Sequence, residues 1–98
     1  MATLLTDKDR QNQMQNLHSD WQCQNDKQLY LEIKTRNFAA AYHYVHLAAF
    51  ISEQMDHHAD IAFGWGYCQI RITTHDAGGL TALDFDFAKR FDMARAST

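Results

Sequence analysis

The spacing of apolar residues changes twice along this chain, and no other feature constrains its fold as strongly. Over residues 29–33, apolar and polar residues alternate, which predicts a half-buried strand. From residue 38 to 55, apolar residues recur every three or four positions, which predicts a helix. Strand-like alternation then returns in two phases, first at Ile61, Phe63, Trp65 and Tyr67 and then at Cys68, Ile70 and Ile72. The change of phase between Tyr67 and Cys68 predicts a bulge or turn, and Gly64 and Gly66 flank its expected position.

Capping residues predict where three helices begin. Thr6 precedes a polar helix that covers Asp9 to Leu17, and Asn37 precedes the long central helix. Thr81 precedes the last helix, with Asp84 three residues later in a variant of the capping box. The central helix is expected to bury one stripe, formed by Phe38, Ala41, Tyr42, Val45, Ala49 and Ser52. The last helix is expected to bury Leu83, Phe87, Ala88 and Phe91.

The predicted elements follow one another in the order α-β-β-α-β-β-α, because Trp21 begins a further short strand and Asn25-Asp26 supplies a turn after it. Short strands interleaved with helices predict an α+β fold. We expect a two-layer sandwich in which helices cover one face of a four-stranded, mostly antiparallel sheet. The 98 residues suffice for one domain, spanning 1–98.

Composition excludes several classes of protein. The net charge of −3, without a cluster of Lys or Arg, argues against direct binding of nucleic acid. No apolar run approaches the roughly 20 residues that span a membrane, and the first ten residues do not resemble a signal peptide. Two isolated cysteines, Cys23 and Cys68, suit a reducing compartment. We therefore expect a cytoplasmic protein that can also reach the nucleus.

Three of the six histidines lie beside predicted loops, together with several carboxylates and hydroxyls. These residues are His57, His58 and His75, accompanied by Glu53, Asp56, Thr73, Thr74, Asp76 and Asp84. Imidazole exchanges protons near neutral pH, and a neighbouring carboxylate fixes its tautomer. If the two loops meet in space, the histidines could perform general acid–base catalysis.

Other interpretations of these residues stay open on the pattern alone. Adjacent histidines reach one metal ion less easily than histidines spaced two to four apart, and no HxH or HxxxH pair includes His57 or His58. Cys68 lies in the apolar phase of a strand, as an inert core thiol does. Gly78-Gly79 lacks the GxGxxG order of a phosphate-binding loop. Histidines scattered over the surface remain the alternative to a three-histidine site.

The motif as a whole resembles the pterin-4a-carbinolamine dehydratase family. It comprises Glu53-x-x-x-His57-His58, an aromatic at Trp65, Thr73-Thr74-His75-Asp76-x-Gly78-Gly79-Leu80-Thr81, and Asp84. The resemblance runs from about Phe38 to Asp92, and in the N-terminal third it rests mainly on Trp21. It implies an α+β fold and the dehydration of 4a-hydroxytetrahydropterin to quinonoid dihydropterin, which recycles the cofactor of aromatic amino-acid hydroxylases. It also implies that no metal and no organic cofactor take part.

The resemblance further implies roles for individual residues. His57 and His75 would exchange protons while His58 orients the substrate, and Asp84 would complete the catalytic set. The pterin-binding residues would be Glu53, Asp56, Trp65, Thr73, Thr74 and Asp76, with Glu53 also supporting an imidazole.

The chain departs from the family pattern at Ala59, where a proline usually follows the histidine pair, so the backbone there lacks a fixed φ angle. It also carries Trp65 where a smaller aromatic is common. Family members form dimers or tetramers, and the stripe of His43, His46 and Phe50 is a candidate interface. A second function known in the family, binding and dimerising a transcription factor without turnover, is the alternative to catalysis.

Overall fold

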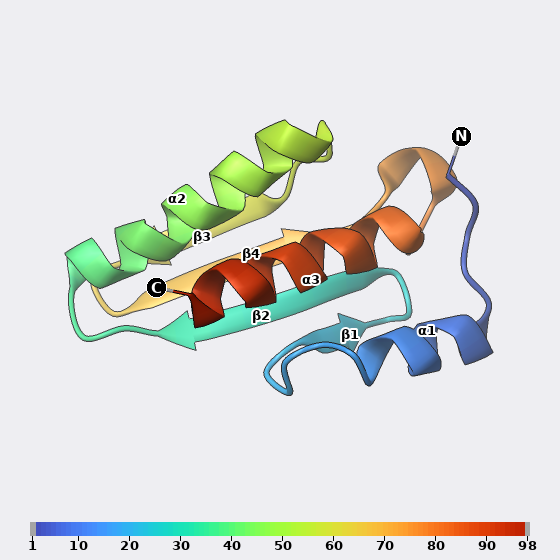
Figure 1. The fold of residues 1–98 in the computed structure, drawn as a ribbon, viewed down its shortest axis with the longest axis horizontal. Coiled ribbons are helices and arrows are strands. Elements are labelled where there is room, and N and C mark those ends of the chain that lie inside the picture. The colour runs from blue at the N-terminus through green and yellow to red at the C-terminus, as the bar shows by residue number, and fades with distance from the viewer. Residues whose placement is uncertain (1, 98) are drawn as a thin grey trace.

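Four antiparallel strands form one sheet in the order β1-β2-β4-β3 (Figure 1). The strands are β1 (Gln22–Gln24), β2 (Gln28–Lys34), β3 (Asp60–Gly64) and β4 (Tyr67–Ile72). The helices are α1 (Asp7–Met14), α2 (Phe38–Met55) and α3 (Ala82–Ala96), and a short 3-10 turn, η1, covers His75–Ala77. This computed structural model describes residues 2–97. It confirms the predicted α+β class and element order.

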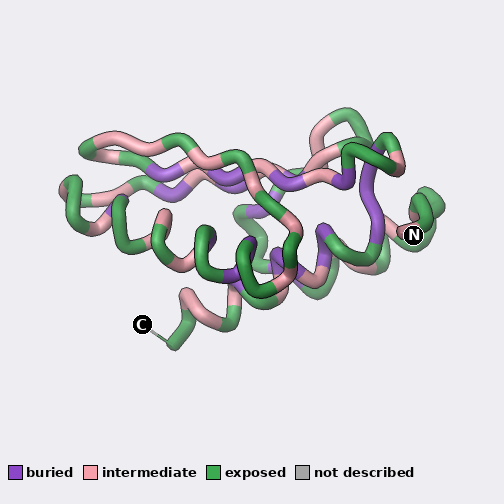
Figure 2. The backbone as a smooth tube through the Cα atoms, turned by 90° about the horizontal axis from the view of Figure 1, so that it is seen from above, coloured by how far each residue is buried: buried purple, intermediate pink, exposed green. Residues whose placement is uncertain are grey.

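Helices α2 and α3 lie side by side on one face of the sheet, as the view in Figure 2 shows. The sheet and α3 share a core built from alternate strand residues. Leu29, Leu31 and Ile33 of β2 face the same side as Cys68, Ile70 and Ile72 of β4, and all six are buried. The register pairs Leu31 with Ile70, so the inward residues of the two strands meet directly. Phe85, Phe87, Ala88 and Phe91 of α3 cover them.

The predicted caps are confirmed. The side chain of Thr6 accepts a hydrogen bond from the Asp9 amide, and the side chain of Asn37 accepts one from the Ala40 amide. Helix α1 is shorter than expected, since it ends at Met14, and it buries none of its residues. No helix between residues 2 and 97 is long and apolar enough to cross a membrane.

The buried face of α2 differs in part from the prediction, since only Ala41 and Ser52 of the predicted stripe are buried. Its buried residues are Ala41, Ala48, Ile51 and Ser52, whereas Phe38 and Tyr42 are 51% and 56% exposed. Ala49 is exposed as well. Apolar residues occupy so much of the circumference of this helix that the periodicity fits more than one face. The small residues pack against the molecule, and the two rings lie at the sheet edge beside Phe63, whose centroid is 5.2 Å from that of Phe38.

One further local prediction was wrong, and one was confirmed. Leu83 is 37% exposed, because Asp84 takes the inward position in the first turn of α3 and turns its neighbour outward. The change of phase is a hairpin turn at residues 65–66, which confirms the turn predicted beside Gly64 and Gly66. Strands β3 and β4 pair up to Gly64 and Tyr67, which leaves Trp65 at the tip of the turn.

Candidate active site

Seven of the ten predicted site residues line one shallow cavity of about 240 Å³ where α2 ends and β4 ends. These residues are Asp56, His57, His58, Thr73, Thr74, His75 and Asp76. The structure therefore brings the two predicted loops together. A larger cavity of about 610 Å³ at the opposite end of α2 is lined by residues such as Lys34 and Arg36, and contains none of the predicted set.

The end of α2 places the histidine pair. Asp56 adopts the left-handed conformation, with φ of 50°, and turns the chain out of the helix. The amide of His57 donates to the Ser52 carbonyl at 3.0 Å, and the amide of Asp56 donates to the Glu53 carbonyl at 3.3 Å. These two bonds form a Schellman-type ending, in which glycine is the usual left-handed residue. The pair His57-His58 thus begins directly after a rigid helix end.

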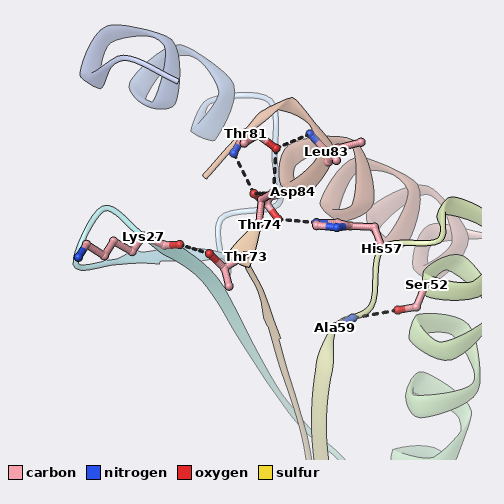
Figure 3. Close-up of polar contacts among 9 residues, drawn as sticks. All are labelled: Lys27, Ser52, His57, Ala59, Thr73, Thr74, Thr81, Leu83 and Asp84. Carbon is pink, nitrogen blue, oxygen red and sulfur yellow. Dashed lines mark hydrogen bonds and ion pairs between the residues drawn. The ribbon is translucent and has the colours of Figure 1, made fainter. Parts of the chain in front are cut away.

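A buried carboxylate orients His57 (Figure 3). Asp84 is fully buried at the start of α3, and its Oδ1 lies 2.7 Å from Nε2 of His57. Its Oδ2 accepts hydrogen bonds from the Thr74 hydroxyl at 2.8 Å and from the Thr81 amide at 2.9 Å. The capping box of α3 therefore does more than begin a helix, because the same carboxylate holds an imidazole from another element.

The hydrogens of this network have one consistent arrangement. The only hydroxyl proton of Thr74 points to Asp84, so the Thr81 hydroxyl, 2.8 Å away, must donate to the oxygen of Thr74. The oxygen of Thr81 in turn accepts from the Leu83 amide. A carboxylate can only accept, and therefore Nε2 of His57 carries a proton. In the neutral ring, Nδ1 is then the nitrogen with a free lone pair.

The other two histidines are held more loosely. Nε2 of His58 contacts a carboxylate oxygen of Glu53, but their side chains are 55% and 77% exposed. A contact between two such exposed groups constrains the ring weakly. His75 begins η1 and is exposed at the cavity, beside Asp76. Both imidazoles are thus accessible to a ligand.

Trp65 does not line the cavity that contains the three histidines. It lies in the β3–β4 turn, where its carbonyl accepts from the Thr35 hydroxyl just ahead of α2. The histidines follow the other end of α2 and adjoin Asp60, at the opposite end of β3. The length of β3 places Trp65 roughly 15 Å away from them along the sheet. Within one chain it does not contact this cavity.

Several contacts at the site were not predicted from the sequence. The side chain of Thr73 donates to the carbonyl of Lys27, which ties the β1–β2 turn to the site. A second cavity of about 380 Å³ shares Thr73 and His75 with the first and is lined by polar residues of that turn. Ser52 accepts hydrogen bonds from two residues of the histidine loop. No helical or strand pattern marks these contacts, since Lys27 and Thr73 lie 46 positions apart and Ala59 lies seven positions after Ser52.

Neither cysteine is placed or activated as a nucleophile. Cys68 is buried, and desolvation raises its pKa to about 11, so its thiol is poorly nucleophilic. Cys23 is also a free thiol, and burial raises its pKa. Among residues 2–97, no group of three His, Cys, Asp or Glu side chains is arranged to hold a metal ion. The polar chemistry of the cavity rests on imidazoles, hydroxyls and carboxylates.

Known proteins with a similar fold include two solved structures. A transcriptional coactivator/pterin dehydratase from Brucella melitensis superposes with a TM-score of 0.82 over 91% of this chain and 95% of that one, at 23% identity. A pterin dehydratase-like protein described as a RuBisCO assembly factor of the alpha-carboxysome gives a TM-score of 0.65 over 83% and 95%, at 24% identity. At these identities the similarity establishes the fold alone.

Relatives that are similar in sequence establish the family of this chain. A protein of Picosynechococcus sp. named "Putative pterin-4-alpha-carbinolamine dehydratase" is 39% identical over 95% of this chain and 99% of its own length. A protein of the same name from Paracoccus denitrificans is 41% identical over 76% of this chain and 70% of its own length. The model of the family "Pterin 4 alpha carbinolamine dehydratase" matches residues 3–94. The chain therefore belongs to the pterin 4 alpha carbinolamine dehydratase family.

Proposed function

We propose that this protein dehydrates 4a-hydroxytetrahydropterin to quinonoid dihydropterin by general acid–base catalysis. The observation that carries the proposal is the bond between His57 and the buried Asp84, at the wall of a cavity that His58 and His75 also line. Membership of the family supports the pterin substrate. The adjoining polar cavity that shares Thr73 and His75 offers room for a substituent on the ring.

The reaction requires two proton transfers. The bond between C4a and its hydroxyl oxygen breaks, the oxygen takes up a proton and leaves as water, and a ring nitrogen loses a proton. We assign the second transfer to His57, because the proton on Nε2 is committed to Asp84 and the lone pair on Nδ1 is free. His75 would deliver the proton to the leaving oxygen. His58 would orient the ring, and Asp56, Thr73, Thr74 and Asp76 would frame it at the cavity wall.

A rate measurement tests this assignment. The loss of 4a-hydroxytetrahydropterin is followed by ultraviolet absorbance with and without the protein, in the presence of EDTA. We expect an acceleration that survives EDTA, which would support metal-free catalysis. It should fall by about 100-fold or more in both His57→Ala and His75→Ala. His46→Ala is the matched control, because His46 is an exposed histidine of α2 away from the cavity. A folded protein without any acceleration would refute the enzymatic assignment.

The second candidate is a protein-binding function. Exposed aromatic rings support it, since Phe38, Tyr42 and Trp65 are each more than half exposed. Unusually large exposed apolar patches mark interaction surfaces. A transcription factor is the partner that the resemblance implies. Of two solved proteins with this fold, one is described as a transcriptional coactivator/pterin dehydratase and the other as a RuBisCO assembly factor. A binding protein of this kind would keep its partner affinity in His75→Ala and show no pterin turnover when unaltered.

Self-association and location remain predictions. The outer edge of β3 pairs with no other strand among residues 2–97, which suits pairing with a second copy in a homodimer or homotetramer. The free thiols Cys23 and Cys68 are compatible with the reducing conditions of the cytoplasm.

A further inference from the structure

Ser52 connects both sides of the loop that carries His57 and His58. It lies in the last turn of α2 and is only 4% exposed. Its carbonyl accepts from the His57 amide at 3.0 Å, and its hydroxyl oxygen accepts from the Ala59 amide at 3.2 Å. The second bond is drawn in Figure 3, where it joins the helix to the chain just before β3. His57 and His58 therefore lie in a segment that a single residue holds from both ends.

The two bonds constrain different parts of this segment. The bond to His57 belongs to the helix ending and persists with any residue at position 52, since it uses the backbone carbonyl. The bond to Ala59 uses the hydroxyl and disappears when the side chain cannot accept. Ala59 is half-buried, so water would only partly replace the hydrogen bond that its amide loses. The Ser52 hydroxyl thus holds the backbone at Ala59, which follows His58 in the chain.

A proline at position 59 would constrain the same backbone in another way. Its ring holds φ near −65°, and it has no N–H to donate. A chain with proline there would restrict the loop covalently and would leave the Ser52 hydroxyl without this partner. Hydrogen bonding from Ala59 and a proline ring are thus alternative means to hold the same segment, and they exclude each other.

We propose that Ser52 is a positioning residue for the histidine pair, and that its hydroxyl takes the place of a proline ring at position 59. This inference rests on the proposed function only for its catalytic readout. The loop geometry itself can be measured whether or not the protein turns over a pterin.

The test compares Ser52→Ala, Ala59→Pro and the double variant, with the exposed Ser19→Ala as the matched control. We expect Ser52→Ala to speed amide exchange at Ala59 by about 10-fold, which corresponds to the loss of one hydrogen bond of ordinary strength. We expect kcat to fall by a similar factor while KM changes less, because the histidines remain present but are less well oriented. In Ala59→Pro the same serine substitution should lower kcat less than twofold.

Several outcomes would overturn the proposal. Unchanged exchange at Ala59 in Ser52→Ala would do so, and so would an equal loss of kcat with and without the Ala59→Pro substitution. If Ser52→Ala fails to fold, comparing Ala59→Pro with the double variant still tests the proposal, because the double variant should fold and keep its activity. If the unaltered protein shows no turnover, the proposed function fails, and the nuclear magnetic resonance signals of the His57 and His58 rings report loop order instead. They should broaden in Ser52→Ala and remain sharp in the double variant.

Discussion

Replacing Asp84 by asparagine should separate catalysis from folding. Oδ2 of Asp84 accepts two hydrogen bonds, from the Thr74 hydroxyl and the Thr81 amide. In Asp84→Asn the amide oxygen must occupy that position, because the NH2 group cannot accept. The NH2 group then faces Nε2 of His57, which must accept rather than donate. The proton of the imidazole moves to Nδ1, and the lone pair assigned to catalysis is lost.

The two expected effects differ in size. Charge-assisted hydrogen bonds are about 1 kcal/mol stronger than neutral ones, and a carboxylate near a helix N-terminus contributes up to about 1 kcal/mol. The three bonds of Asp84 persist in weaker form, which with the helix term costs about 4 kcal/mol. A buried neutral amide costs less desolvation than a buried carboxylate, which offsets about half of this loss, so we expect the free energy of unfolding to fall by about 2 kcal/mol. In a chain of this size, that corresponds to a decrease in Tm of roughly 8–16 °C. Loss of a general base should lower kcat by about 100- to 10,000-fold.

Three measurements make this prediction testable. Calorimetry gives the Tm, ultraviolet absorbance gives kcat, and the nitrogen chemical shifts of the imidazole distinguish the two tautomers. Asp86→Asn is the matched control, since Asp86 is half-exposed on the same helix and pairs with Arg90 at 3.2 Å. Asp84→Ala should be far less stable, by about 4–5 kcal/mol, because it leaves buried donors without acceptors. A kcat near that of the unaltered protein, with the tautomer inverted, would refute the assignment of His57 as the base.

Three other predictions concern the ends of the site, the core and the surface. Asp56→Gly should raise the free energy of unfolding by about 0.5–1 kcal/mol, measured by urea titration, because φ is 50° there; a loss of stability would contradict this account of the helix ending. Cys68 should resist a thiol reagent at pH 8 in the folded protein, since a pKa of about 11 leaves about one thiolate in a thousand; modification at the rate of the urea-unfolded chain would count against its burial. Phe50→Glu should reduce the mass measured by light scattering if the 58% exposed Phe50 lies at an interface between copies, and an unchanged mass would remove that stripe from consideration.

The parts of the fold that the sequence could predict are those set by local chemistry. Helix starts at Thr6, Asn37 and Thr81 follow from side chains that bond to backbone amides a few residues away. The strands follow from alternation, because one face of a two-layer sheet must be buried. The convergence of His57 and His75 was anticipated from loop positions, and the structure places both at one cavity.

The parts that could not be predicted depend on tertiary packing. The exposed Phe38 and Tyr42 fit a helical stripe as well as the residues that are buried, so periodicity alone could not select the face. Trp65 has the residue type of a ligand platform, but strand pairing places it at a hairpin turn. Ser52 bonds to a residue seven positions later, beyond the reach of any helical pattern.

The three imidazoles of the cavity are held in different ways, and this difference follows from secondary structure. His57 is bonded to a carboxylate that two other donors hold at the start of α3, where the helix dipole also favours a negative charge. Its orientation is therefore set before a ligand arrives. His58 and His75 are exposed and lie in short non-helical or 3-10 segments, so their rings can adjust when a ligand binds. A fixed base beside two adaptable imidazoles suits a reaction in which one proton is removed at a defined ring nitrogen while another is delivered to a departing oxygen. It also means that substitutions in α3 affect the chemistry through Asp84, whereas substitutions at His58 or His75 leave the stability of the fold nearly unchanged.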